Sequence, residues 1–209
     1  MTTREPARPI TGYAVLGLLS LRPWTTYELA QQVRRSLHWF WTRAERRIYE
    51  EPKRLVENGW VEAREGWTGK RRHTTYAITD AGREALAAWL GTPAQVRTVE
   101  DEAMLRVFFA DAGTLEQLRA RLDELSEVTR SRLEELATMT EELLSDGGTF
   151  PDRLHLQALA LRRQVDQETD TLAWATWARR QTDAWASATD PGGWDTGRVL
   201  REVLADARA

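Results

Sequence analysis

Trp60-Val-Glu-Ala-Arg-Glu65, Gly66-Trp-Thr-Gly-Lys-Arg-Arg-His73 and Thr74-Thr-Tyr-Ala-Ile-Thr79 follow one another in the chain and decide its fold. The first and last of these segments are rich in β-branched and aromatic residues, which is typical of strands. The middle segment contains turn glycines and three consecutive cations. The stretch therefore predicts a β-hairpin with a basic tip.

Helices are predicted on both sides of this hairpin. An apolar helix begins near Ile10, a second is opened by the capping box Thr25-Thr-Tyr-Glu28, and a third is opened by Thr42-Arg-Ala-Glu45. The third helix is expected to end before Asn58-Gly59. A fourth helix follows the hairpin, with a cap at Thr79 or the next residue.

The third predicted helix has an apolar face and a charged face. At about 100° per residue, the apolar positions gather on one side, and they are Ala44, Ile48, Pro52 and Leu55. The opposite side carries five cations and two acids, which are Arg43, Arg46, Arg47, Glu50, Lys53, Arg54 and Glu57. Such a stripe alone is typical of a solvated helix face. Its place directly before a basic hairpin favours a binding surface.

Three helices, a hairpin and a fourth helix follow the plan of a winged helix-turn-helix, in which the third helix enters the major groove and the hairpin forms a wing. The charge distribution agrees with this plan. Residues 1–90 carry a net charge of +5 and the remainder carries -8, although the whole chain of 209 residues carries only -3. A basic half joined to an acidic half indicates two domains with different partners. We expect a DNA-binding domain over residues 1–92.

Six segments within residues 10–90 carry a family resemblance. They are Gly12-Tyr-Ala-Val-Leu-Gly-Leu-Leu19, Thr26-Tyr-Glu-Leu29, Ile48-Tyr49, Arg54-Leu55, Asn58-Gly-Trp-Val61 and Tyr76-Ala-Ile-Thr-Asp-Ala-Gly82. In this order they resemble the DNA-binding domain of the PadR-type transcriptional regulators. The chain departs from the family where Glu50-Glu51 separates Tyr49 from Pro52, because family members commonly place proline directly after this tyrosine. The resemblance implies a dimeric regulator, more often a repressor than an activator.

The residues expected to contact double-stranded DNA fall into two groups. The candidates for base edges lie early on the charged face, and they are Thr42, Arg43, Arg46, Arg47 and Glu50. The candidates for phosphate flank them, open the second helix or form the wing tip, and they are Tyr49, Lys53, Arg54, Thr26, Tyr27, Lys70, Arg71 and Arg72. A twofold homodimer would present two such surfaces to a palindromic operator.

Residues 93–209 predict a helical domain, so that the fold class is mainly α with a small β-hairpin. A short apolar helix is expected over residues 99–110, followed by long antiparallel helices from Thr114 to about Ser145 and from Pro151 to about Ala188. Each long helix carries an apolar seam, formed by Leu115, Leu118, Leu122, Leu125, Leu136, Met139 and Leu143 on the first and by Leu161, Val165 and Leu172 on the second. The seams could pack within one chain or join two chains. The resemblance favours dimerisation.

Tryptophan is concentrated near the C-terminus. Trp174, Trp177 and Trp185 are expected on one helix face, where such large apolar rings are normally buried against other parts of the protein. The other hypothesis is that these three, with Trp39 and Trp41, wall a pocket for a flat apolar effector. A last amphipathic helix is expected from Thr196 to Ala209.

Composition argues against several other functions. The chain has no cysteine and three histidines, so we expect no disulfide, no metal centre and no cofactor. No Walker loop is present, because Leu18-Leu19 follows Gly17 in place of lysine and serine or threonine, and we expect no enzyme. The longest apolar stretch, Tyr13–Leu21, is too short to span a membrane, which predicts a cytoplasmic protein without a membrane partner. The alternative function is a winged-helix protein–protein interaction module.

Overall fold

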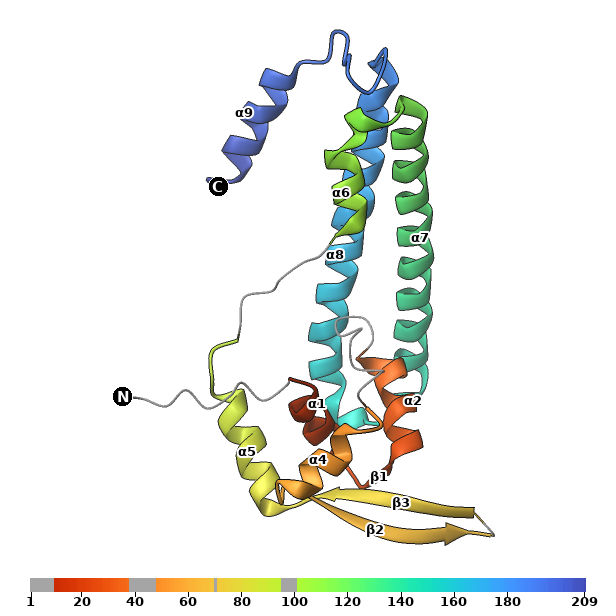
Figure 1. The fold of residues 1–209 in the computed structure, drawn as a ribbon, viewed down its shortest axis with the longest axis vertical. Helices are drawn as coiled ribbons and strands as arrows, with labels where there is room; N and C mark the ends of the chain where they lie inside the picture. Colours follow the sequence, from red (N-terminus) through yellow and green to blue (C-terminus); the bar gives the residue numbers. More distant parts are fainter. Residues whose placement is uncertain (1–9, 38–47, 70, 95–100) are drawn as a thin grey trace. The chain divides into compact units, whose positions relative to one another are not determined.

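The computed structural model describes residues 10–37, 48–69, 71–94 and 101–209. The chain divides into two compact units, residues 1–97 and 98–209, each of which is described by itself (Figure 1). The elements of the first unit are α1 (Ile10–Leu19), β1 (Trp24–Thr25), α2 (Thr26–Ser36), α4 (Glu51–Glu57), β2 (Val61–Thr68), β3 (Arg71–Ile78) and α5 (Asp80–Leu90). The expected fold class, mainly α with a small hairpin, is confirmed.

The core of the first unit lies around α1. This helix is apolar along most of its length, and it contacts α4, α5 and β3. The side chains that are at most 2% exposed come from α1, α2, the turn before α4, α4 and β2. They are Val15, Leu16, Leu19, Leu29, Val33, Ile48, Pro52, Leu55 and Val61. The indole of Trp24 is also buried and donates to the Leu18 carbonyl over 2.8 Å. Burial of these apolar side chains stabilises the unit.

The predicted capping box at the start of α2 is confirmed. Thr25 accepts from the Glu28 amide, and Glu28 Oε2 accepts from both the amide and the hydroxyl of Thr25 over 2.7 and 2.8 Å. The other carboxylate oxygen accepts from Arg22 over 3.2 Å. Partial burial alone would raise the pKa of Glu28, but the hydrogen bonds from Thr25 and Arg22 outweigh it and lower this pKa below its ordinary value.

We expect Glu28→Gln to destabilise the protein in a pH-dependent way. Because the folded pKa of Glu28 is lowered, its stabilisation is present above the unfolded pKa and is lost as the pH falls through the folded pKa. At neutral pH the variant should lose about 1 kcal/mol of unfolding free energy, the typical value of a helix cap. Urea denaturation at several pH values measures the deficit. If the loss of unfolding free energy stays the same at acidic pH, this role of the carboxylate is contradicted.

The hairpin is present, but its strands are longer than predicted. The sheet has the antiparallel order β1-β3-β2, and β2 pairs with β3 from Val61↔Ile78 to Thr68↔Arg71. The expected link over residues 66–73 is therefore wrong for most of its length, because cross-strand pairing continues to a loop of two residues. Gly69 opens this loop with φ 61°, a left-handed conformation that glycine adopts easily.

The helix expected from Thr42 to residue 57 is not continuous in its described part. Residues 48–50 form a turn, and α4 begins at Glu51 with Pro52 in its first turn. Proline has no amide to donate, so it fits the first turn of a helix and not its interior. The C-terminal boundary was predicted correctly, since α4 ends before Asn58 and Gly59 has φ 73°.

All regular elements in the described part of the second unit are helices, joined by short loops. Its elements are α6 (Glu102–Phe108), the 3₁₀-helix η1 (Ala110–Ala112), α7 (Leu115–Asp146), η2 (Pro151–Arg153), α8 (Leu154–Gln181), η3 (Thr182–Ala184) and α9 (Thr196–Asp206). The two long helices lie side by side and are joined by a turn in which Gly147 and Gly148 have positive φ (Figure 1). A capping box between Thr114 and Gln117 begins α7.

The seam of α7 packs inside a single chain. Leu118, Leu122 and Leu136 are at most 6% exposed, and α8 is the main contact of their helix. The remaining seam residues are half-buried, and they are Leu115, Leu125, Met139 and Leu143 on α7 and Leu161, Val165 and Leu172 on α8. The three buried leucines are therefore covered without a second chain. The sequence left open whether the seams pack within one chain or join two chains. For these three leucines the structure supports packing within the chain.

The tryptophan face predicted on the last long helix is partly wrong. Trp174 and Trp177 lie on α8 and are half-buried, but α8 ends at Gln181, so Trp185 lies beyond the helix. The Trp185 ring lies 5.4 Å from that of Trp194, whose indole donates to Gln181 over 2.9 Å. The expected effector residues Trp39 and Trp41 lie outside the described residues.

Candidate nucleic-acid interface

The first turn of α2 presents the predicted phosphate contacts at the surface. Thr26 is half-buried, whereas Tyr27 is 62% exposed and its hydroxyl accepts from Gln31 over 2.9 Å. Amides in the first turn of a helix have no intrahelical acceptor, and they attract anions together with the positive end of the helix dipole. Contact of this end of α2 with a phosphate group stays a prediction.

The segment 48–57 separates an inner from an outer face, as the sequence predicted. Ile48 and Leu55 are at most 2% exposed, whereas Tyr49 is 53% exposed and Glu50, Lys53 and Arg54 are all exposed. Lys53 forms no ion pair with any residue that the structure describes. An exposed lysine of this kind suits a phosphate, which needs a cation but no fixed geometry.

Arg54 is held by an acid that the sequence analysis missed. Glu51 is only 4% exposed, and its Oε2 lies 3.3 Å from Arg54 Nη1. Its other oxygen lies 2.9 Å from the place that a Cβ on Gly12 would occupy. A buried carboxylate needs a partner, and here it gains both the guanidinium and a position near the beginning of α1, where the helix dipole is positive. The signal in the sequence was Gly12, which leaves room for the carboxylate.

The wing combines an ion pair with an exposed aromatic ring. Arg72 pairs with Glu65 on the opposite strand, and Trp67, which lies directly across from Arg72, is 68% exposed. Cross-strand partners point to the same face of a hairpin. The outer wing therefore offers a cation and an indole side by side. No pattern in the sequence indicated a role for Trp67 or Glu65.

His73 is half-buried at the base of the outer wing. Its ring covers Gly66 on the opposite strand, since Nε2 lies 2.9 Å from the position of a Cβ there. Glycine at this position lets the imidazole approach the backbone.

Several predicted contacts lie outside the described residues. They are Thr42, Arg43, Arg46, Arg47 and Lys70, together with the side chain of Arg71. The described residues thus bring together Tyr49, Glu50, Lys53 and Arg54 on one segment and place Arg72 on the wing. Base contacts by the earlier residues stay a prediction.

The described residues contain neither a candidate metal site nor a candidate membrane-spanning helix. No group of three or more histidine and acidic side chains within them is arranged to hold a metal ion. Among the described helices, none has the length and apolarity needed to cross a membrane.

Two protein families match consecutive parts of the chain. The transcriptional regulator PadR-like family matches residues 15–88, and the virulence activator alpha C-terminal family matches residues 99–183. The negative transcriptional regulator PadR of Bacillus subtilis (strain 168) is 28% identical over 172 residues, which make up 78% of this chain and 91% of that protein.

Solved structures of the same relative have a similar fold. Bacillus subtilis PadR in complex with operator DNA matches with a TM-score of 0.73 at 23% identity, over 83% of this chain and 99% of that one. The same protein in complex with p-coumaric acid matches with a TM-score of 0.67 at 25% identity, over 87% of this chain and 99% of that one. These likenesses confirm the expected winged helix-turn-helix with a C-terminal helical domain.

Proposed function

The chain belongs to the PadR-like family of transcriptional regulators, and from this premise we propose that it is a repressor that binds a palindromic operator as a homodimer. The family is one of regulators and not of enzymes. The name of the Bacillus subtilis relative supports negative regulation. Its structure with operator DNA supports the same kind of ligand for this chain.

The observation that carries the proposal is the outer face of segment 48–57. Exposed Tyr49, Lys53 and Arg54 lie opposite buried Ile48 and Leu55, so the fold presents this face to a ligand and uses the other for the core. In a winged helix-turn-helix this segment belongs to the element that enters the major groove. The side chains that precede it in sequence, Arg43 to Arg47, would then contact base edges while Lys53 and Arg54 contact phosphate.

The wing completes the proposed interface. Lys70, Arg71 and Arg72 would follow the phosphate backbone beside the groove. Trp67 adds an apolar surface that can pack on a deoxyribose or enter the minor groove, where apolar side chains are used as wedges. Glu65 limits the freedom of Arg72 and so fixes the direction of its guanidinium.

We further propose that a flat aromatic effector changes the affinity for DNA. The complex of the Bacillus subtilis relative with p-coumaric acid supports this proposal. Trp174 and Trp177 on α8 are half-buried and can contribute to a binding site. Such a ligand acts only if it binds one geometry of the dimer better than another.

Fluorescence anisotropy tests the function directly. The purified protein is titrated into labelled duplex from upstream of its own gene and, as the control, into a scrambled duplex across a salt series. We expect selective binding of the first duplex with affinity that falls steeply with salt, and weaker binding after addition of an aromatic acid. Absence of binding at low salt would contradict the proposal and favour the protein–protein interaction module.

A further inference from the structure

Arg54 lies at the surface of the first unit but is tied to its interior. The Arg54 side chain is 54% exposed, whereas the side chain of its partner Glu51 is only 5% exposed. A distance of 3.3 Å joins Arg54 Nη1 to Glu51 Oε2, and the two residues are three positions apart on α4. One end of the guanidinium is therefore held by the fold, while much of the side chain faces solvent.

The carboxylate of Glu51 is enclosed where α4 contacts α1. Its Oε1 lies 2.9 Å from the place that a Cβ on Gly12 would occupy, and Leu55 Cδ2 lies 3.6 Å from the same place. A cavity of about 200 Å³ adjoins the carboxylate, and Arg54 is the only cation among the described residues that line it. Glu51 therefore has no second cation nearby that could replace Arg54.

The burial of Glu51 restricts Arg54 when a ligand binds. Removing one partner from a buried ion pair is strongly destabilising, because the other charge is left in the interior without compensation. We therefore expect Arg54 to stay on Glu51 in a complex. A guanidinium has five N–H donors in a rigid planar fork, so the donors that Glu51 does not use remain available and point in a fixed direction.

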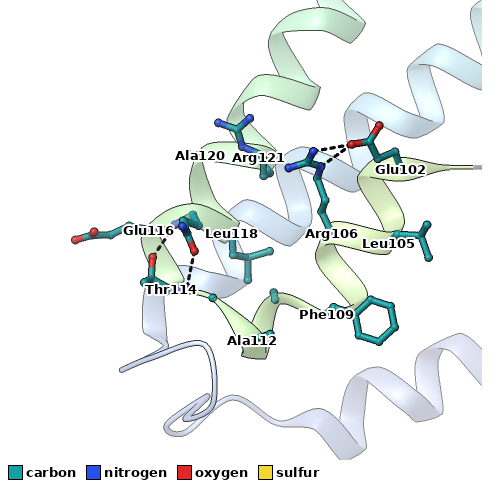
Figure 2. A pocket seen from close by; sticks show the side chains of 13 residues that line it. Glu102, Leu105, Arg106, Phe109, Ala112, Thr114, Glu116, Leu118, Ala120 and Arg121 are labelled. Atoms are coloured by element: carbon teal, nitrogen blue, oxygen red, sulfur yellow. Dashed lines mark hydrogen bonds and ion pairs between the residues drawn. The ribbon is translucent and has the colours of Figure 1, made fainter.

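Ion pairs between two exposed side chains lack this restriction. Arg106 and Glu102 on α6, drawn in Figure 2, are 57% and 78% exposed. Such a pair contributes little, because water solvates either partner after separation. Lys53, the neighbour of Arg54, is exposed and forms no ion pair with any described residue, so its amine can follow a phosphate in many directions.

We propose that Glu51 is a positioning residue for operator binding, which holds the guanidinium of Arg54 in the one direction that meets a phosphate of the correctly docked duplex. The proposal rests on the DNA binding proposed above and adds the residue that orients one of its contacts. Phosphate contacts fix the register of a protein on DNA. A mobile cation adds affinity in every register, whereas an oriented guanidinium adds it mainly in one. Glu51 thus disfavours DNA by its charge and favours the operator by its geometry.

Glu51→Gln separates these two effects, because glutamine keeps the size of the side chain and removes its charge. Anisotropy gives the affinities for the upstream duplex and for the scrambled duplex. We expect the affinity for the scrambled duplex to rise, and the ratio of the two affinities to fall about tenfold, as for the loss of one hydrogen bond to a charged group. Glu84→Gln on α5 changes the net charge equally at an exposed position and should leave the ratio unchanged. An unchanged ratio in Glu51→Gln would overturn the proposal.

A double-mutant cycle with Arg54→Lys shows whether Glu51 acts through Arg54. Lysine keeps a positive charge beside Glu51 but has no planar fork to orient. We expect Arg54→Lys to lower the ratio about as much as Glu51→Gln, and the double variant to lower it no further.

Two results of this cycle would overturn the proposal. Additive losses would mean that Glu51 acts on the fold and not through Arg54. An unchanged ratio in Arg54→Lys would do so even if Glu51→Gln does not fold, because this variant leaves the buried acid in place. A parent protein that binds both duplexes equally would instead contradict the proposed function, and the proposal with it.

Discussion

Gly82→Ala is expected to cost about 3 kcal/mol of unfolding free energy, the upper part of the range for an added methyl group in a packed site. A Cβ on Gly82 would lie 2.2 Å from the Trp60 carbonyl oxygen and 2.9 Å from Ile78 Cγ1. The carbonyl cannot move away easily, because it accepts a hydrogen bond of 3.0 Å from the Thr79 amide. The variant would therefore separate α5 from the base of the wing.

Gly17→Ala is the matched control for this prediction. Gly17 lies inside α1, and a Cβ there would meet nothing within 4 Å. Alanine in place of glycine within a helix should stabilise the protein by about 0.5–1 kcal/mol. Urea denaturation of both variants measures the two effects. Equal stability of the two variants would contradict the close approach at Gly82.

Local signals in the sequence predicted several element boundaries correctly. Thr25 and Glu28 form the capping box that the spacing indicated, and α4 ends where Asn58-Gly59 suggested. Thr114 begins α7 as expected. In each case the residues that decide the boundary are within four positions of one another, so the decisive hydrogen bonds are visible as a short pattern.

The features that the sequence did not predict depend on distant partners. β1 consists only of Trp24 and Thr25, and it exists because Trp24 pairs with Tyr76. Two residues are too few to show an alternating pattern. The end of α8 at Gln181 is also nonlocal, since Arg119 of α7 donates to the Thr182 carbonyl there.

The candidate interface was predictable in its charge and not in its geometry. The sequence placed Lys53 and Arg54 on the outer face of their segment correctly. It did not indicate that Arg54 is paired with buried Glu51 or that Arg72 is paired with Glu65. The Arg72–Glu65 pair depends on the register of two strands, and the burial of Glu51 beside Arg54 depends on the approach of α4 to Gly12 of α1. Acidic neighbours thus reduce the free positive charge of the surface.

Charge reversal at the two basic elements tests the central claim, that this chain binds operator DNA through the helix before Asn58 and through the wing. The double variant Arg46→Glu with Arg71→Glu is compared with a control double variant, Arg130→Glu with Arg162→Glu. The control changes the net charge of the chain by the same amount, but its substitutions lie on α7 and α8. Anisotropy on the upstream duplex gives the affinity, and sedimentation gives the mass.

We expect Arg46→Glu with Arg71→Glu to lose about 100-fold or more in affinity for the duplex, and its salt dependence to weaken by about one ion per lost phosphate contact. The dimer should be unaffected, because neither residue lies in the helical domain. The control pair should bind DNA with nearly the affinity of the parent protein, since neither of its residues belongs to the two basic elements proposed to contact DNA. Equal losses in both variants would show that only net charge matters, and this result would contradict the account.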